Sequence, residues 1–167
     1  NNIDISNPES WTTSNLPKGS PAGIETDALS YNDWKVLNFS DENDQFETLS
    51  SPESDPDEDG FINASEYAFG TSPTNSIDRP IFDYNLIKSN DNDFLGITFR
   101  ASAKASDVVI TGETSNSLLN WLENSTIHSI SLSEDKSHKI MTLRSNQIFG
   151  IEKRHQMRLK TTLLLGD

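Results

Sequence analysis

The sequence predicts a mostly β protein, an antiparallel β-sandwich of about six strands preceded by a small helical segment. From Pro80 onward, apolar residues alternate with polar ones, and polar turns such as 89–93 and 133–137 separate several of the alternating runs. Before Pro80, apolar residues recur at helical spacing in two short stretches. Strands and helices do not alternate along the chain, so we do not expect a parallel sheet.

Composition divides the 167 residues into three parts. Residues 1–29 are rich in Asn, Ser, Thr, Pro and Gly, which is typical of a linker or an extended lead-in. Trp11 is an exception there, and we interpret it as a packing anchor. Residues 30–79 form the helical segment, and residues 80–167 form the β-sandwich module.

The first predicted helix covers 31–39. Ser30 is a suitable N-cap, with Asp33 three residues later in a variant of the capping box. Tyr31, Trp34 and Leu37 then follow at helical spacing, and we expect Trp34 to lie in the core.

A polar loop is predicted over 40–54. The second short helix covers about 63–69 and ends at Gly70, a residue that favours helix termination.

The β half contains six runs of strand-like composition. In the first run, Phe82, Tyr84 and Leu86 share one face, which we expect to be buried. The runs cover 81–87, 94–100, 107–114, 126–132, 138–144 and 155–161.

Charge is distributed unevenly and excludes one class of partner. The net charge is −13, and residues 1–79 carry 16 acidic but only 3 basic side chains. Such a surface repels phosphate backbones, so we do not expect nucleic acid to bind. The chain has no Cys and no apolar run long enough for a transmembrane helix.

Oxygen-bearing residues recur at regular spacing in the loop 55–66. Carboxylates occupy positions 1, 3, 5 and 12 of a twelve-residue loop, and Gly60 stands at position 6, where the chain must turn sharply. Position 7 would offer a backbone carbonyl and position 9 an amide side chain. The predicted ligands are Asp55, Asp57, Asp59, the carbonyl of Phe61, Asn63 and Glu66.

This pattern indicates a calcium ion, because Ca²⁺ is a hard cation that takes six to eight oxygen ligands. Without a cation, four carboxylates in twelve residues would repel one another. Magnesium fits less well, since it prefers a smaller site and keeps its waters. The alternative interpretation is an acidic, solvated turn before a helix.

The calcium loop resembles those of dockerins and thrombospondin type 3 repeats. DPDEDGFINASEYAFGTSP (55–73) is still more similar to a loop of secreted bacterial proteins, where an aromatic-x-x-Trp helix such as YNDW (31–34) precedes it. SNSLLNW (115–121) and HQMRLKTT (155–162) also resemble that family. Only one loop is present, which argues against the cohesin binding of dockerins, since dockerins use two.

The resemblance implies an accessory module, because such modules usually lie at the C-terminal end of secreted bacterial proteins, many of which degrade polysaccharides. The implied roles are stabilising, tethering or binding glycan. The implied partners are the parent catalytic domain in the same polypeptide and a polysaccharide. We expect a secreted, extracellular, monomeric module, since extracellular modules bind calcium at the high concentrations found outside cells.

Catalysis is not predicted, because the three His residues occur without a metalloprotease or hydrolase motif. An independent hydrolase is therefore the least favoured interpretation. For glycan binding, the candidate residues are Trp121, Arg158 and Lys160. Trp121 could equally be a core residue, and the basic residues could simply be solvated. The alternative function is a purely structural spacer or sorting domain whose only ligand is calcium.

Overall fold

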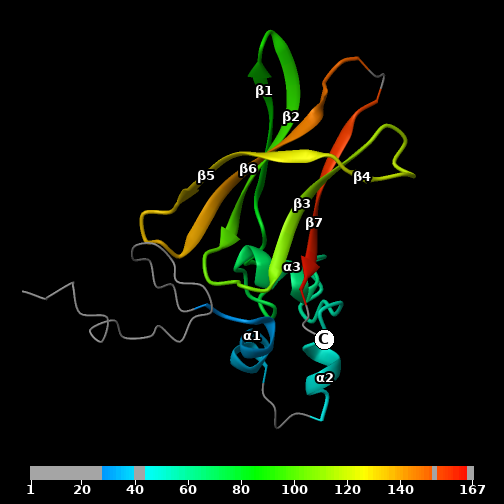
Figure 1. Ribbon diagram of the computed structural model, residues 1–167. Helices are drawn as coiled ribbons and strands as arrows, with labels where there is room; N and C mark the ends of the chain where they lie inside the picture. Colours follow the sequence, from blue (N-terminus) through cyan, green and yellow to red (C-terminus); the bar gives the residue numbers. More distant parts are fainter. Residues whose placement is uncertain (1–27, 40–43, 152–153, 165–167) are drawn as a thin grey trace, which may run out of the picture.

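The computed structural model describes residues 28–39, 44–151 and 154–164 (Figure 1). The described residues form two antiparallel sheets, with short helices gathered at one end of the sheets. The predicted mostly β, sandwich-like fold is therefore confirmed. Trp11 and nearly all of the predicted lead-in 1–29 lie outside the described residues.

The helical segment contains α1 (Tyr31–Asn38), α2 (Phe46–Leu49) and α3 (Asn63–Phe69). Ser30 caps α1 as predicted, because its Oγ accepts the N–H of Asp33 at 3.1 Å. α3 ends as predicted at Gly70, whose φ of 76° lies in the left-handed region.

The short helix α2 corrects the prediction of a loop throughout 40–54. The N–H of Ser50, the residue that follows α2, donates to the carbonyl of Phe46 at 2.8 Å and closes a single helical turn. A turn this short has no helical periodicity to detect in a sequence.

One sheet has the strand order β1-β2-β6-β5, and the other has the order β4-β3-β7. Each of the six predicted runs lies within a strand apart from at most one residue at its start, and the short β4 adds a seventh strand among the described residues. The strand bounds are β1 (Phe82–Ser89), β2 (Asn92–Ser102), β3 (Val108–Ser115), β4 (Leu122–Glu123), β5 (Ser125–Leu132), β6 (His138–Ile148) and β7 (Gln156–Leu163).

The core between the sheets is closed at one end by α3. Phe69 of α3 packs with Ile97 and Phe99 of β2 and with Leu143 of β6. Its ring meets the ring of Phe99 edge to face, with centroids 5.7 Å apart. The helix α3 therefore belongs to the same hydrophobic core as the sandwich.

A second, aromatic cluster joins the helices to one another. Tyr31 and Trp34 of α1 pack against Tyr67 of α3, and Trp34 is only 6% exposed, which confirms its predicted core position. Phe39 also joins the cluster, with its ring 6.1 Å from that of Trp34. Leu37, the third residue at helical spacing, is 73% exposed, whereas Phe39 beyond the end of α1 is buried.

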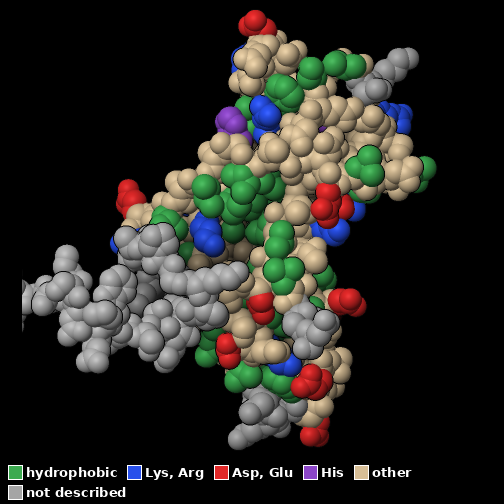
Figure 2. Space-filling view, in the orientation of Figure 1, with side chains coloured by type: hydrophobic (Ala, Val, Ile, Leu, Met, Phe, Trp, Pro, Cys, Tyr) green, Lys and Arg blue, Asp and Glu red, His purple; other side chains and the backbone are tan. Residues whose placement is uncertain are grey.

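Tyr84 corrects a second prediction, because its side chain is 65% exposed rather than buried. Tyr84 pairs with Ile97, so it does lie on the sheet face that holds the core. The facing sheet is narrower, however, and leaves the flanking strands partly uncovered. Ile127 and Ile130 of β5 are exposed at the opposite side for the same reason, and Figure 2 shows hydrophobic side chains in the hollow there.

Candidate metal centre

The loop 55–66 connects α2 to α3 and folds back around its own carboxylates. Asp55 accepts the N–H of Gly60 at 2.9 Å and that of Asp59 at 3.2 Å. Asp59 in turn accepts the N–H of Phe61 at 2.8 Å. Gly60 has a φ of 95°, which a side chain would make unfavourable. These contacts hold the three predicted aspartates on one tight turn.

Asp55, Asp57 and Asp59 converge as a metal site requires. One carboxylate oxygen from each residue lies within 4.8 Å of the other two. Each aspartate is partly buried, so solvent only partly screens their mutual repulsion. The structure therefore brings together the three side chains that the sequence places at loop positions 1, 3 and 5.

Glu66 of α3 is the most unusual group of the site. It is 0% exposed, and neither Oε1 nor Oε2 has a hydrogen-bond partner among the residues that the structure describes. One oxygen each of Asp57 and Asp59 is also buried and unpartnered. A buried carboxylate with no donor is costly, and a cation bound by these residues would supply a partner for the four oxygens.

Burial is the largest cause that raises the pKa of Glu66, to about 8, and the charges of the neighbouring aspartates raise it further. Those aspartates are first Asp57, then Asp59 and Asp55, with Asp78 contributing as well. The three predicted aspartates of the loop thus act electrostatically on the predicted glutamate. Asp78 was missed by the sequence analysis, because it lies outside the twelve-residue loop.

The remaining predicted ligands fit in different ways. The carbonyl of Phe61 accepts no hydrogen bond from the residues that the structure describes, which leaves it free for position 7. Asn63 is fully buried, and its Nδ2 donates to the carbonyls of Leu49 and Ser51, both at 2.7 Å. Only Oδ1 of Asn63 is unpartnered, so only this atom could face a cation or a bound water.

The donor set fits calcium by its chemistry. All the converging groups offer oxygen, and hard divalent cations prefer oxygen ligands. Asp55, Asp57, Asp59 and Glu66 would hold the ion, together with the carbonyl of Phe61. Bound calcium would neutralise the mutual repulsion of these carboxylates and supply partners for their unpaired oxygens.

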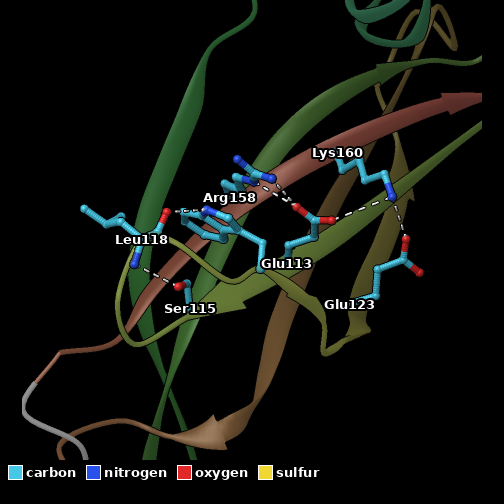
Figure 3. Close-up of polar contacts among 7 residues, drawn as sticks. Glu113, Ser115, Leu118, Glu123, Arg158 and Lys160 are labelled. Carbon is cyan, nitrogen blue, oxygen red and sulfur yellow. Dashed lines mark hydrogen bonds and ion pairs between the residues drawn. The ribbon is translucent and has the colours of Figure 1, made fainter.

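The predicted glycan residues also lie together, on the outer face of the smaller sheet (Figure 3). The guanidinium of Arg158 stands 4.2 Å from the ring centroid of Trp121. The indole Nε1 of Trp121 donates to the carbonyl of Leu118 at 3.2 Å. Trp121 is partly buried, intermediate between the exposed and the core alternatives.

The two cations of this face are paired with glutamates. Arg158 contacts Glu113 at 2.7 Å, and Lys160 contacts Glu123 at 3.1 Å and Glu113 at 3.7 Å. Glu113 is buried beneath them at 6% exposure. Because each cation has an acidic neighbour, this face offers only a weak positive field to a polyanion.

The described part of the chain contains no helix long and apolar enough to cross a membrane. Comparison of the chain with protein-family models, curated protein sequences and solved structures gave no match.

Proposed function

We propose that this chain is a non-catalytic accessory module whose fold is stabilised by one calcium ion in the loop 55–66. The observation that carries the proposal is Glu66, which is fully buried without a hydrogen-bond partner and is electrostatically coupled to three converging aspartates. Such a carboxylate has no reason to be ionised in the core unless a cation is bound. A bidentate glutamate at loop position 12 is the ligand that completes a calcium shell.

We further propose that the module serves a secreted bacterial protein that degrades polysaccharide, as a carbohydrate-binding or tethering domain. The assignment is supported by the resemblance of the loop 55–73 and its flanking segments to those of secreted bacterial proteins. The aromatic ring of Trp121 supports it as well, because sugar C–H faces stack on rings. Because the module and the parent catalytic domain would belong to the same polypeptide, the module would keep that domain near its substrate.

The alternative is a structural spacer whose only ligand is calcium. The pairing of Arg158 and Lys160 with glutamates favours it, because this face then offers little net positive charge to an acidic glycan.

Calorimetry tests the metal proposal. Protein freed of metal by a chelator should bind about one calcium per chain and bind magnesium much more weakly. Glu66→Gln keeps the side-chain shape but removes the bidentate charge, so its calcium affinity should fall sharply. Glu58→Gln is the matched control, because Glu58 lies in the same loop but is exposed and holds no ligand position. No calcium binding, or equal binding by both variants, would contradict the proposal.

Affinity electrophoresis separates the two functions. Calcium-loaded protein is run through gels that contain neutral or acidic polysaccharides, with serum albumin as the non-binding reference. Retardation by at least one polysaccharide supports a carbohydrate-binding module. If every polysaccharide leaves the mobility unchanged, the spacer becomes the better description.

A further inference from the structure

A cavity of about 500 Å³ lies between the edge strands β1 and β7, on one open side of the sandwich. Its apolar lining includes Leu86 of β1, Leu95 and Ile97 of β2, and Met157 of β7. The cavity lies between the β1–β2 hairpin and the β6–β7 connection. Figure 1 shows both of these segments at the end of the molecule away from the helices. Its volume falls within the range of about 300–1,000 Å³ that is typical of small-ligand sites.

Aromatic rings line the same cavity. Tyr84 is 65% exposed and Phe149 is 41% exposed, so both rings are accessible to a ligand. Phe149 stacks on His155, with centroids 6.3 Å apart and planes inclined by 27°. The N–H of Phe149 donates to the carbonyl of Asp93 at 2.7 Å, which ties the β6–β7 connection to the hairpin. The stacked pair is therefore positioned before any ligand arrives.

Unpaired polar atoms lie among these rings. Both ring nitrogens of His155 and Oε1 of Gln156 are buried and have no hydrogen-bond partner in the described part of the chain. A neutral imidazole offers one donor and one acceptor, and the amide oxygen offers a second acceptor. A ligand with several hydroxyl groups could satisfy all three atoms, because each hydroxyl both donates and accepts.

The lining carries no fixed charge. It contains no Asp, Glu, Lys or Arg among the residues that the structure describes. Burial lowers the pKa of His155, which keeps its imidazole uncharged at neutral pH. A charged ligand would therefore find no counter-ion in the cavity and would lose hydration on entering it.

We propose that this cavity binds an uncharged sugar unit of a polysaccharide. The C–H face of a pyranose would stack on Phe149 or Tyr84, while its hydroxyl groups would bond to His155 and Gln156. This inference rests on the proposed carbohydrate-binding role, but it assigns that role to a neutral ligand and to a site separate from Trp121 and Arg158.

Calorimetry on the full, calcium-loaded chain tests the assignment. The probes are cellotetraose, maltotetraose, xylotetraose and mannotetraose, with a tetramer of galacturonic acid as the acidic comparison. At least one neutral probe should bind. Phe149→Ala should weaken that binding about tenfold, the upper range for an aromatic contact. Gln156→Ala should also weaken it, and provides a second test if the melting temperature shows that Phe149→Ala does not fold.

Two control variants locate the site. Ile130→Ala alters an exposed apolar residue on the opposite open side of the sandwich, and Trp121→Ala alters the other aromatic candidate. Both should keep the affinity of the wild type.

If binding is lost in Trp121→Ala and kept in the cavity variants, this inference is wrong but the carbohydrate-binding function stands. If no neutral probe binds while the acidic tetramer or a polysaccharide gel still gives binding, the inference again fails alone. If none of these carbohydrates binds, both fail, and a calcium titration shows whether the metal-stabilised spacer remains.

Discussion

At the scale of single residues, Glu66 shows how one buried side chain makes the fold depend on a ligand. Its carboxylate is fully enclosed by protein, and the nearby aspartates disfavour its negative charge. Two events can relieve this cost, the binding of a proton to Glu66 or the binding of a cation beside it. Protons and calcium should therefore compete for the same oxygens.

This competition predicts a release of protons on binding. The pKa of metal-free Glu66 is about 8, so the group is largely protonated at pH 7 and must lose its proton to bind calcium. Calorimetric titrations at pH 7 in two buffers of different ionisation enthalpy should give different apparent binding enthalpies. The size of this difference should correspond to the release of nearly one proton for each calcium ion bound. Identical enthalpies in the two buffers would show that Glu66 is already ionised.

The same shift sets the sign of a pH dependence without metal. The folded pKa of about 8 lies above the ordinary value of 4.5, so the protonated group favours the folded state at low pH. This contribution is complete below pH 4.5 and is lost as the pH rises towards 8. Chelated wild type should therefore lose stability relative to chelated Glu66→Gln across this window, as measured by urea unfolding. A constant difference between the two would contradict the assignment.

Two tryptophans should differ in what they contribute to stability. Trp34 is 6% exposed and stacks on Tyr31, with ring centroids 5.3 Å apart. Trp34→Ala should cost about 3–5 kcal/mol, the usual range for a buried aromatic residue. Trp121→Ala should cost clearly less in the same urea unfolding measurement, because its ring is only partly buried. Equal losses would make Trp121 a core residue and remove it as a glycan platform.

At the scale of elements, the end of α3 connects the metal loop to the sandwich. The N–H groups of Gly70 and Thr71 both donate to the carbonyl of Glu66, at 2.7 and 3.0 Å. Tyr67 on the same helix donates its hydroxyl to the carbonyl of Leu29 at 2.5 Å and also contacts the carboxylate of Asp107. The seven residues of α3 thus include a proposed metal ligand, a residue of the core between the sheets and a contact to the segment that precedes β3.

Gly70→Ala should destabilise the protein for two separable reasons. The left-handed backbone at φ 76° costs an L-residue about 1 kcal/mol. A Cβ there would also lie 3.1 Å from the ring of His138 and 3.3 Å from Ser102. Gly150→Ala is the matched control, because Gly150 also has a positive φ but has open space around it. Urea unfolding should give the larger loss for Gly70→Ala, and equal losses would mean that the crowding is relieved at no cost.

At the scale of the whole molecule, two hydrophobic clusters make the helical segment and the sandwich one body. Phe69 lies in the cluster between the sheets, while Val108 and Leu163 of the smaller sheet pack against the aromatic cluster of the helices. The loop 55–66 runs into α3, which supplies a residue to each of the two clusters. A change in the loop should therefore affect the stability of the entire fold.

Removal of calcium by a chelator should therefore lower the melting temperature of the whole fold in a single transition, and should not unfold the helical segment separately. If the dissociation constant is one-hundredth of the free calcium concentration, binding adds about 2.7 kcal/mol to the stability. For a domain of this size, removal of the ion should lower the melting temperature by roughly 5–10 °C. Calorimetry should show the same loss in Glu66→Ala without chelator. A second, separate transition would contradict the view of one body, and an unchanged melting temperature would mean that the loop does not stabilise the fold.

The sequence by itself determined the features that depend on near neighbours in the chain. The cap at Ser30, the end of α3 at Gly70 and the six alternating runs are all local patterns, so they were predicted correctly or nearly so. A twelve-residue loop can bring its own oxygens together, which is why Asp55, Asp57 and Asp59 converge as expected.

Only the tertiary structure decided what each face of each strand meets. Tyr84 follows the pattern of a buried residue but is exposed, because burial depends on the width of the opposite sheet. Glu113 is 45 residues from Arg158 in the chain, so their pairing appears only when β3 lies beside β7. The cavity that includes Phe149 and His155 likewise exists only because strands from two sheets leave one side open. Periodicity tells which residues share a face, but the packing of distant segments determines whether that face is covered, paired or left available to a ligand.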